Sequence, residues 1–168
     1  MAVLFGVTIN PAKAQLKIGY VDSDTIIKEL PEAQDAQQKL QDIVKGWQDE
    51  LDKMSKDLQA KYEDYQKKEA LYNDATKQSE QKKLVDEEQQ VNQFRQDKFG
   101  TQGELAAQRD KIMSPIREKI LKVIAQVAKE EKVSFMFDKA GDVLLLYADK
   151  TADYTYKVLD RLKRGTQK

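Results

Sequence analysis

The most constraining feature of this sequence is a long segment that reads as helix and is too polar to be a globular core. Between Glu32 and Ile112 it contains no proline, and its only glycines are Gly46, Gly100 and Gly103. Apolar and aromatic residues recur there at alternating steps of three and four residues: Leu40, Val44, Trp47, Leu51, Met54, Leu58, Tyr65 and Tyr72. This heptad pattern indicates a helix that packs lengthwise on a second helix. A chain of 168 residues cannot bury such a helix in one globule, so we expect an extended arm.

The arm is expected to fold back on itself near its middle. Residues 72–79 are the least helix-favouring stretch, because Asn, Asp, Thr and Ser side chains compete for backbone hydrogen bonds. We place the reversal there, with an outgoing helix before it and a returning helix over residues 81–112. A single unbroken helix is the alternative, although five later residues do not continue the phase of the first seam cleanly: Leu84, Val91, Phe94, Lys98 and Leu105.

The segments that flank the arm predict a small body that contains β-strands. Residues 16–22, 133–138 and 143–148 have the composition of strands, and Ser23 is a candidate N-cap for a short helix that Pro31 ends or offsets. Ser114 and Pro115 predict either a helix start or a kink. Thr151 is a candidate cap for a last helix that carries Tyr154, Val158, Leu159 and Leu162.

These elements predict an α+β fold in which a long antiparallel helical hairpin projects from a small β-containing body. The body comprises residues 15–31 and 113–168, and the hairpin comprises residues 32–112. Three short strands expose open edges and are marginally stable alone, so we expect the body to associate with further copies of the chain. The apolar strand residues are the expected contacts in that association: Ile18, Tyr20, Phe135, Phe137, Leu144, Leu145 and Leu146.

The N-terminus resembles the end of a secretory signal. An apolar run from Ala2 to Ile9 is followed by Ala12-Lys13-Ala14, a small-residue cleavage pattern. Residues 1–14 are therefore interpreted as a signal-peptide remnant that is cleaved after Ala14. The alternative is a buried N-terminal strand. A membrane-spanning helix is not expected, because eight apolar residues are too few to span a bilayer, which needs about 20.

The composition argues against catalysis, metal binding and nucleic-acid binding. The chain has no Cys and no His, and its 29 basic residues are balanced by 29 acidic ones. It shows neither a phosphate-binding glycine loop nor a serine nucleophile motif. Asp22-Ser23-Asp24 has the look of a metal or acid pair, but a helix cap is the simpler interpretation. We therefore expect no enzymatic activity, no metal site, no cofactor and no nucleic-acid partner.

The arm offers two sets of candidate functional residues. Trp47 and Tyr65 lie on the seam, so packing between the helices is their expected role. Four other aromatic residues are candidates for a binding surface: Tyr62, Tyr72, Phe94 and Phe99. If the chain reverses near residue 75, Gly46 lies roughly level with Gly100 and Gly103, which predicts either a hinge or close helix packing at that level.

These features together resemble the Skp/OmpH family of periplasmic chaperones. The resemblance covers the whole chain after residue 14 in its order of elements, and it is most specific at residues 17–31 and 113–159. The segments that carry it best are Pro115-Ile116-Arg117-Glu118-Lys119-Ile120 and Phe137-Asp138-Lys139-Ala140-Gly141-Asp142. The best-known members are strongly basic, whereas this chain is neutral and residues 32–111 carry a net charge of −4.

The resemblance implies a homotrimer whose arms surround a cavity for unfolded outer-membrane proteins. The expected function is that of an ATP-independent periplasmic holdase that prevents its clients from aggregating, with transient contact to the membrane surface. A structural coiled-coil protein of the envelope without client binding is the first alternative. A prefoldin-like chaperone is less consistent, because that architecture places its β-hairpins in the middle of the chain and its coiled-coil helices at the termini.

Overall fold

The computed structural model describes residues 16–141 and 145–165 and divides into two compact units. One unit, here called the hairpin unit, runs from Lys28 to Lys119. The other, here called the β unit, combines the chain up to Ile27 with the chain from Ile120 onward. In the described part of the chain, no helix is both long enough and apolar enough to cross a membrane.

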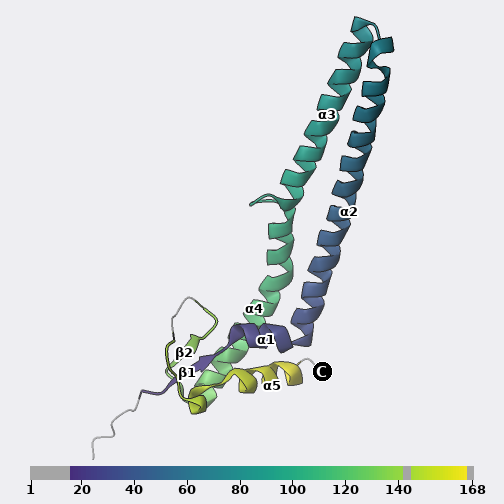
Figure 1. Cartoon of the computed structure of the whole chain (residues 1–168). Helices are drawn as coiled ribbons and strands as arrows, with labels where there is room; N and C mark the ends of the chain where they lie inside the picture. The colour runs from purple at the N-terminus through teal and green to yellow at the C-terminus, as the bar shows by residue number, and fades with distance from the viewer. Residues whose placement is uncertain (1–15, 142–144, 166–168) are drawn as a thin grey trace, which may run out of the picture. The chain divides into compact units, whose positions relative to one another are not determined.

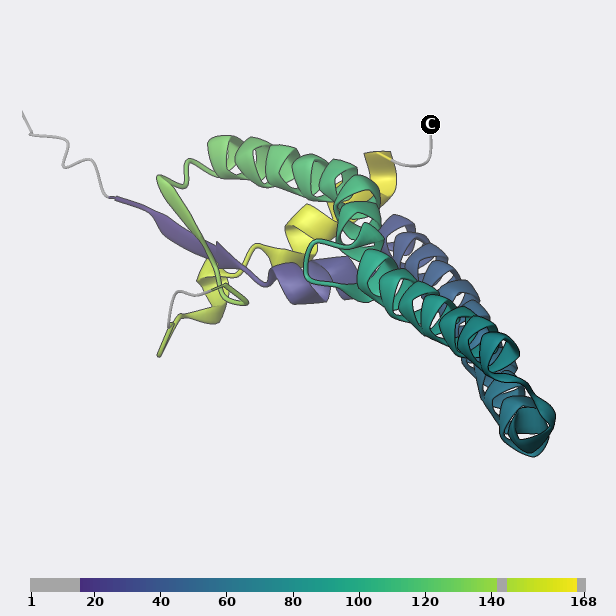
Figure 2. The same cartoon turned by 90° about the horizontal axis from the view of Figure 1, so that it is seen from above.

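The hairpin unit is built on two long antiparallel helices, α2 (Pro31–Lys68) and α3 (Asp74–Phe99). Both views draw these helices side by side (Figures 1 and 2). Pro31 occupies the start of α2, where its missing N–H removes no intrahelical hydrogen bond. A short 3-10 turn, η1 (Glu69–Leu71), follows α2 and leads to the reversal. The predicted hairpin is confirmed, and the single unbroken helix is wrong.

The returning helix starts seven residues earlier than its predicted start at residue 81. Asn73 adopts an extended backbone, and its side chain accepts a hydrogen bond from the backbone N–H of Thr76 at 2.8 Å. The same polar side chain that disfavours a helix interior therefore caps the helix that follows it. The reversal falls at residues 72 and 73, at the edge of the predicted stretch.

The returning arm is two helices rather than one. α3 ends at Phe99, residues 100–103 form a loop, and α4 (Glu104–Glu130) continues the chain. The loop bulges out between the two helices in Figure 1. α4 runs through Ser114 and Pro115 without a break, so the predicted helix start there is wrong. Ile116 and Ile120 are each 4% exposed, and burial of these side chains offsets the hydrogen bond that proline removes.

The β unit contains a two-stranded parallel sheet. β1 (Ile18–Val21) pairs with β2 (Phe135–Asp138), and Ile18 lies opposite Phe135. α1 (Ser23–Glu29) begins directly after β1, where the Asp22 carboxylate accepts the backbone N–H of Thr25 at 2.9 Å. The cap interpretation of this acidic stretch is therefore correct, with Asp22 rather than Ser23 as the capping side chain. The unit's apolar core consists of Val21, Ile26, Val127, Val133, Tyr154, Val158, Leu159 and Leu162.

The third predicted strand is not formed by the described residues. Residues 145–149 adopt no regular structure, and Leu144 lies outside the described residues, as do residues 1–14 with the predicted signal remnant. An apolar run fits a strand or a buried helix segment equally well, and only a neighbouring backbone makes it a strand. The last helix, α5 (Thr155–Gly165), begins four residues after Thr151, which lies instead in the 3-10 turn η2 (Lys150–Ala152).

Candidate functional site

The four candidate aromatic side chains of the arm are all half-buried within the hairpin unit. Phe99 packs edge-on against Trp47, with ring centroids 6.2 Å apart and an interplanar angle of 86°. Tyr72 packs against Tyr65 with centroids 6.1 Å apart. The hydroxyl of Tyr62 donates to the Glu88 carboxylate of α3 at 3.4 Å. The contacts of Phe99 and Tyr62 join α2 to α3, and the expected role of all four residues in binding stays a prediction.

Lys98 ties the end of α3 to both neighbouring helices. Its ammonium lies 4.9 Å from the centroid of the Trp47 ring and 5.8 Å from that of Phe94. The same ammonium forms an ion pair with Glu104 at the start of α4. Aromatic faces attract a cation, so these contacts fix the helix ends on either side of the loop. Sequence analysis missed this role of Lys98, although its spacing of four from Phe94 was visible.

The three glycines of the arm lie at one level of the hairpin, as their numbering predicts. The ring contact between Trp47 and Phe99 places Gly46 opposite the end of α3, next to Gly100. Beyond the backbone of its own helical turns, a Cβ at Gly46 would meet no described heavy atom within 4 Å. A Cβ at Gly100 would lie 2.4 Å from the Gln96 carbonyl oxygen, and one at Gly103 would lie 2.8 Å from that of Asp97. The loop therefore requires glycine at two positions, while Gly46 has open space.

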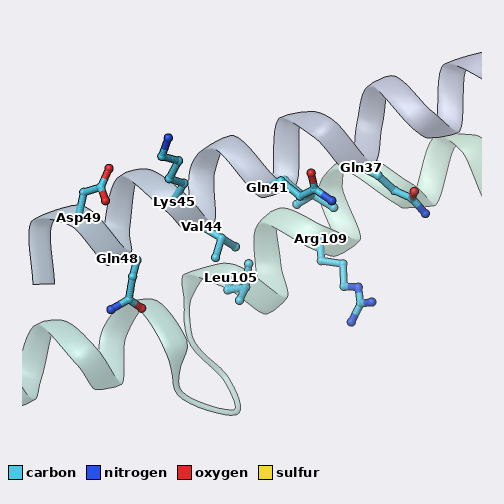
Figure 3. A pocket seen from close by; sticks show the side chains of 9 residues that line it. Gln37, Gln41, Val44, Lys45, Gln48, Asp49, Leu105 and Arg109 are labelled. Carbon is cyan, nitrogen blue, oxygen red and sulfur yellow. The ribbon is translucent and has the colours of Figure 1, made fainter. Parts of the chain in front are cut away.

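An open groove lies between α2 and the first turns of α4, within the hairpin unit. Its volume is about 660 Å³, and Leu40, Val44 and Leu105 supply its apolar lining. Figure 3 shows Val44 of α2 and Leu105 of α4 pointing toward one another across it. The remaining lining residues are polar: Gln37, Gln41, Lys45, Gln48, Asp49 and Arg109. The heptad pattern marks Leu40 and Val44 as seam residues, but the pattern alone does not reveal that the seam stays open here.

The groove is flanked by charged and amide side chains that retain hydrogen-bonding capacity. Neither Lys45 nor Arg109 has an ion-pair partner within residues 16–141 and 145–165, and both are exposed. Gln48 donates to Asp52 at 2.8 Å, whereas the side chains of Gln37 and Gln41 form no hydrogen bond in that part of the chain. An apolar channel bordered by free donors and acceptors can hold a chain that brings both apolar side chains and polar backbone.

The β unit presents apolar side chains on its surface. Among the residues predicted for association, Ile18 is 50% exposed, Phe135 54% and Leu146 87%. Phe137 is more than one third exposed, Leu145 is half-buried, and Tyr20 is buried within the single chain, where the loss of solvent raises its pKa. Sequence analysis missed four further exposed residues of this unit: Leu16, Leu121, Tyr147 and Tyr156. The expected role of this surface in association stays a prediction.

Comparison with known protein families identifies the family to which this architecture corresponds. The model of the OmpH-like outer membrane protein family matches residues 17–162. The chain belongs to this family. The match begins and ends in the β unit and includes the entire hairpin unit, so it covers the groove and all the exposed apolar residues named above except Leu16.

A solved structure shares the fold of this family member. It is that of a protein from Caulobacter crescentus CB15 described as an OmpH-like outer membrane chaperone, with a TM-score of 0.75 and 19% sequence identity. The alignment covers 97% of this chain and 92% of that one. No match was found among curated proteins. At this identity the likeness shows the fold alone.

Proposed function

We propose that this OmpH-like protein is an ATP-independent periplasmic chaperone that holds unfolded outer-membrane proteins and keeps them from aggregating. The observation that carries the proposal is the open groove of the hairpin unit, where apolar residues of a helix seam remain accessible. Membership of the OmpH-like family and the shared fold with a protein described as an outer membrane chaperone support it.

The chemistry of the groove suits a weak holding interaction. Leu40, Val44 and Leu105 offer a small apolar area, so each contact with a client is individually weak. Several arms acting on one client add their contacts through effective concentration, and release then needs no nucleotide. The polar outer faces of α2 and α3 keep the unloaded protein in solution.

We propose further that the chain works as a homo-oligomer, most simply the trimer that the family resemblance implies. The exposed apolar side chains of Ile18 and Phe135, which lie opposite one another in the sheet, and of Leu146 support association through the β unit. Association would bring several hairpins to one client, which the avidity argument requires.

A client-free structural protein of the envelope is the competing function. A spacer has no use for a groove in its seam, and a continuous seam would stabilise it more, so the open groove favours the holdase. The test is light scattering after a urea-unfolded outer-membrane β-barrel protein is diluted into buffer without ATP, with and without the purified protein. We expect suppression at a roughly stoichiometric ratio. Scattering equal to that in buffer alone would support the spacer instead.

A further inference from the structure

We infer that the groove between α2 and α4 is a discrete peptide site that binds a short extended segment with apolar residues at alternate positions and a carboxylate beside them. This inference deepens the proposed holdase function and rests on it. It assigns one location on each chain, rather than the aromatic residues of the seam, as the place where a client segment docks.

The size of the groove sets the length of the segment. Along α2 the lining runs from Gln37 to Asp49, which are twelve residue steps or about 18 Å apart at 1.5 Å per step. An extended chain covers that length with about five or six residues at about 3.3 Å each. Leu40 and Val44 are one helical turn apart, about 6 Å, and alternate side chains of a strand are about 6.6 Å apart. Two successive inward side chains of a strand therefore match the two wall residues, with Leu105 facing them.

The amide side chains favour an extended segment over a helix. A helix satisfies its own backbone N–H and C=O groups, whereas an isolated extended segment brings them unpaired. Gln37 and Gln41 line the groove, and in residues 16–141 and 145–165 their side chains form no hydrogen bond. Each amide can donate and accept, so together they can pair with the bare backbone of such a segment.

The charges at the groove favour an acidic neighbour in that segment. Lys45 and Arg109 line it without an ion-pair partner in the described part of the chain, and Asp49 is the only acidic lining residue. Figure 3 shows Lys45 and Arg109 extending away from the groove in opposite directions, Lys45 from α2 and Arg109 from α4. Both are long, flexible side chains at the borders of the groove, so either can turn toward a carboxylate that follows or precedes the apolar pair, and Arg109 can offer it two parallel hydrogen bonds.

The test is fluorescence anisotropy with the full-length protein and a labelled eight-residue peptide that alternates Leu and Thr and ends in Asp. Leu105→Ser should weaken binding about tenfold, and Leu71→Ser should not change it, because Leu71 is an equally apolar residue 83% exposed at the hairpin turn. Arg109→Gln, which alters an exposed side chain and leaves folding intact, should weaken binding about threefold for the Asp peptide and not for its Asn counterpart. Arg95→Gln on α3 is the charge control.

Three outcomes would overturn the inference. One is equal loss of binding in Leu105→Ser and Leu71→Ser. Another is equal binding of a peptide whose leucines are respaced at three and four residues, which would indicate a helix as the occupant. The third is a change of sedimentation in Arg109→Gln, which would make the groove an interface between copies. Suppression of barrel aggregation is measured on the same variants. If neither the unmodified protein nor any variant binds the peptide but aggregation is still suppressed, the site is refuted and the holdase function is not. If the unmodified protein does not suppress aggregation, the holdase function is refuted.

Discussion

The glycines of the arm allow a test in which one substitution stabilises the hairpin and a neighbouring one destabilises it. Gly46 lies inside α2, whereas Gly103 lies in the loop that joins α3 to α4. Replacing each by Ala adds the same methyl group at the same level of the arm. The two variants therefore differ only in the space and backbone that the methyl group meets.

The expected magnitudes follow from those surroundings. At Gly46 the new Cβ meets no described atom within 4 Å beyond the backbone of its own helical turns, so the helix propensity of alanine should stabilise the hairpin by about 1 kcal/mol. At Gly103 the Cβ would lie 2.8 Å from the Asp97 oxygen and 2.9 Å from the Gly100 nitrogen, both backbone atoms that a side-chain rotation cannot move. Overpacking of this kind destabilises by about 1–3 kcal/mol.

Thermal unfolding measures both effects. Far-UV circular dichroism reports the helices, and fluorescence reports the hairpin because Trp47 is the only tryptophan and lies next to Gly46. We expect Gly46→Ala to raise the Tm by about 2–4 °C and Gly103→Ala to lower it by at least as much. A lowered Tm in Gly46→Ala would refute the reasoning, because it would show that Gly46 is needed for close packing.

The same pair of variants tests whether the glycine level acts as a hinge. A hinge at Gly46 predicts that Gly46→Ala, although more stable, holds large barrel clients less well than small ones. Gly103→Ala serves as the comparison in which stability falls. If Gly46→Ala is more stable and its range of client sizes is unchanged, Gly46 is not part of a hinge.

Two further predictions concern the β unit. Lys132 lies two residues after the end of α4 and has the left-handed backbone conformation, with φ 56°, while the Val133 N–H donates to the Ala128 carbonyl. Glycine adopts this conformation at no steric cost, so Lys132→Gly should stabilise the unit by about 0.5–1 kcal/mol in urea unfolding, and destabilisation would contradict this. Lys157 and Arg161 hold the pKa values of Glu131 and Glu130 below their ordinary value of 4.5. The two carboxylates therefore bind protons more tightly in the unfolded chain than in the folded one. The stability that the two ion pairs contribute is fully present above pH 4.5 and is lost as the pH falls through the lower pKa values of the folded protein. In Glu131→Gln the free energy of unfolding should therefore fall less steeply as the pH is lowered below 4.5, with Glu118→Gln as the control. An equal change of slope in both variants would argue against the ion pair as the cause.

The sequence by itself determined the elements that depend on local pattern. The heptad from Leu40 to Tyr65 specified a long helix with a partner, because a periodic apolar stripe on a polar helix has to be covered. The polar stretch after Tyr72 located the reversal within a few residues, and Pro31 located the start of α2. Each of these follows from the chemistry of residues adjacent in the chain.

Only the tertiary structure decided which apolar residues remain accessible. The seam of α2 carries one pattern throughout, yet Leu51 is buried and Leu40 and Val44 line an open groove. The difference arises from the returning arm of the helical hairpin, where the loop at Gly100 and Gly103 separates α3 from α4. Likewise, the run that includes Leu145 and Leu146 has strand composition, but its described residues pair with no strand. Whether a seam closes or a strand forms depends on a partner far away in sequence, and local periodicity carries no information about that partner.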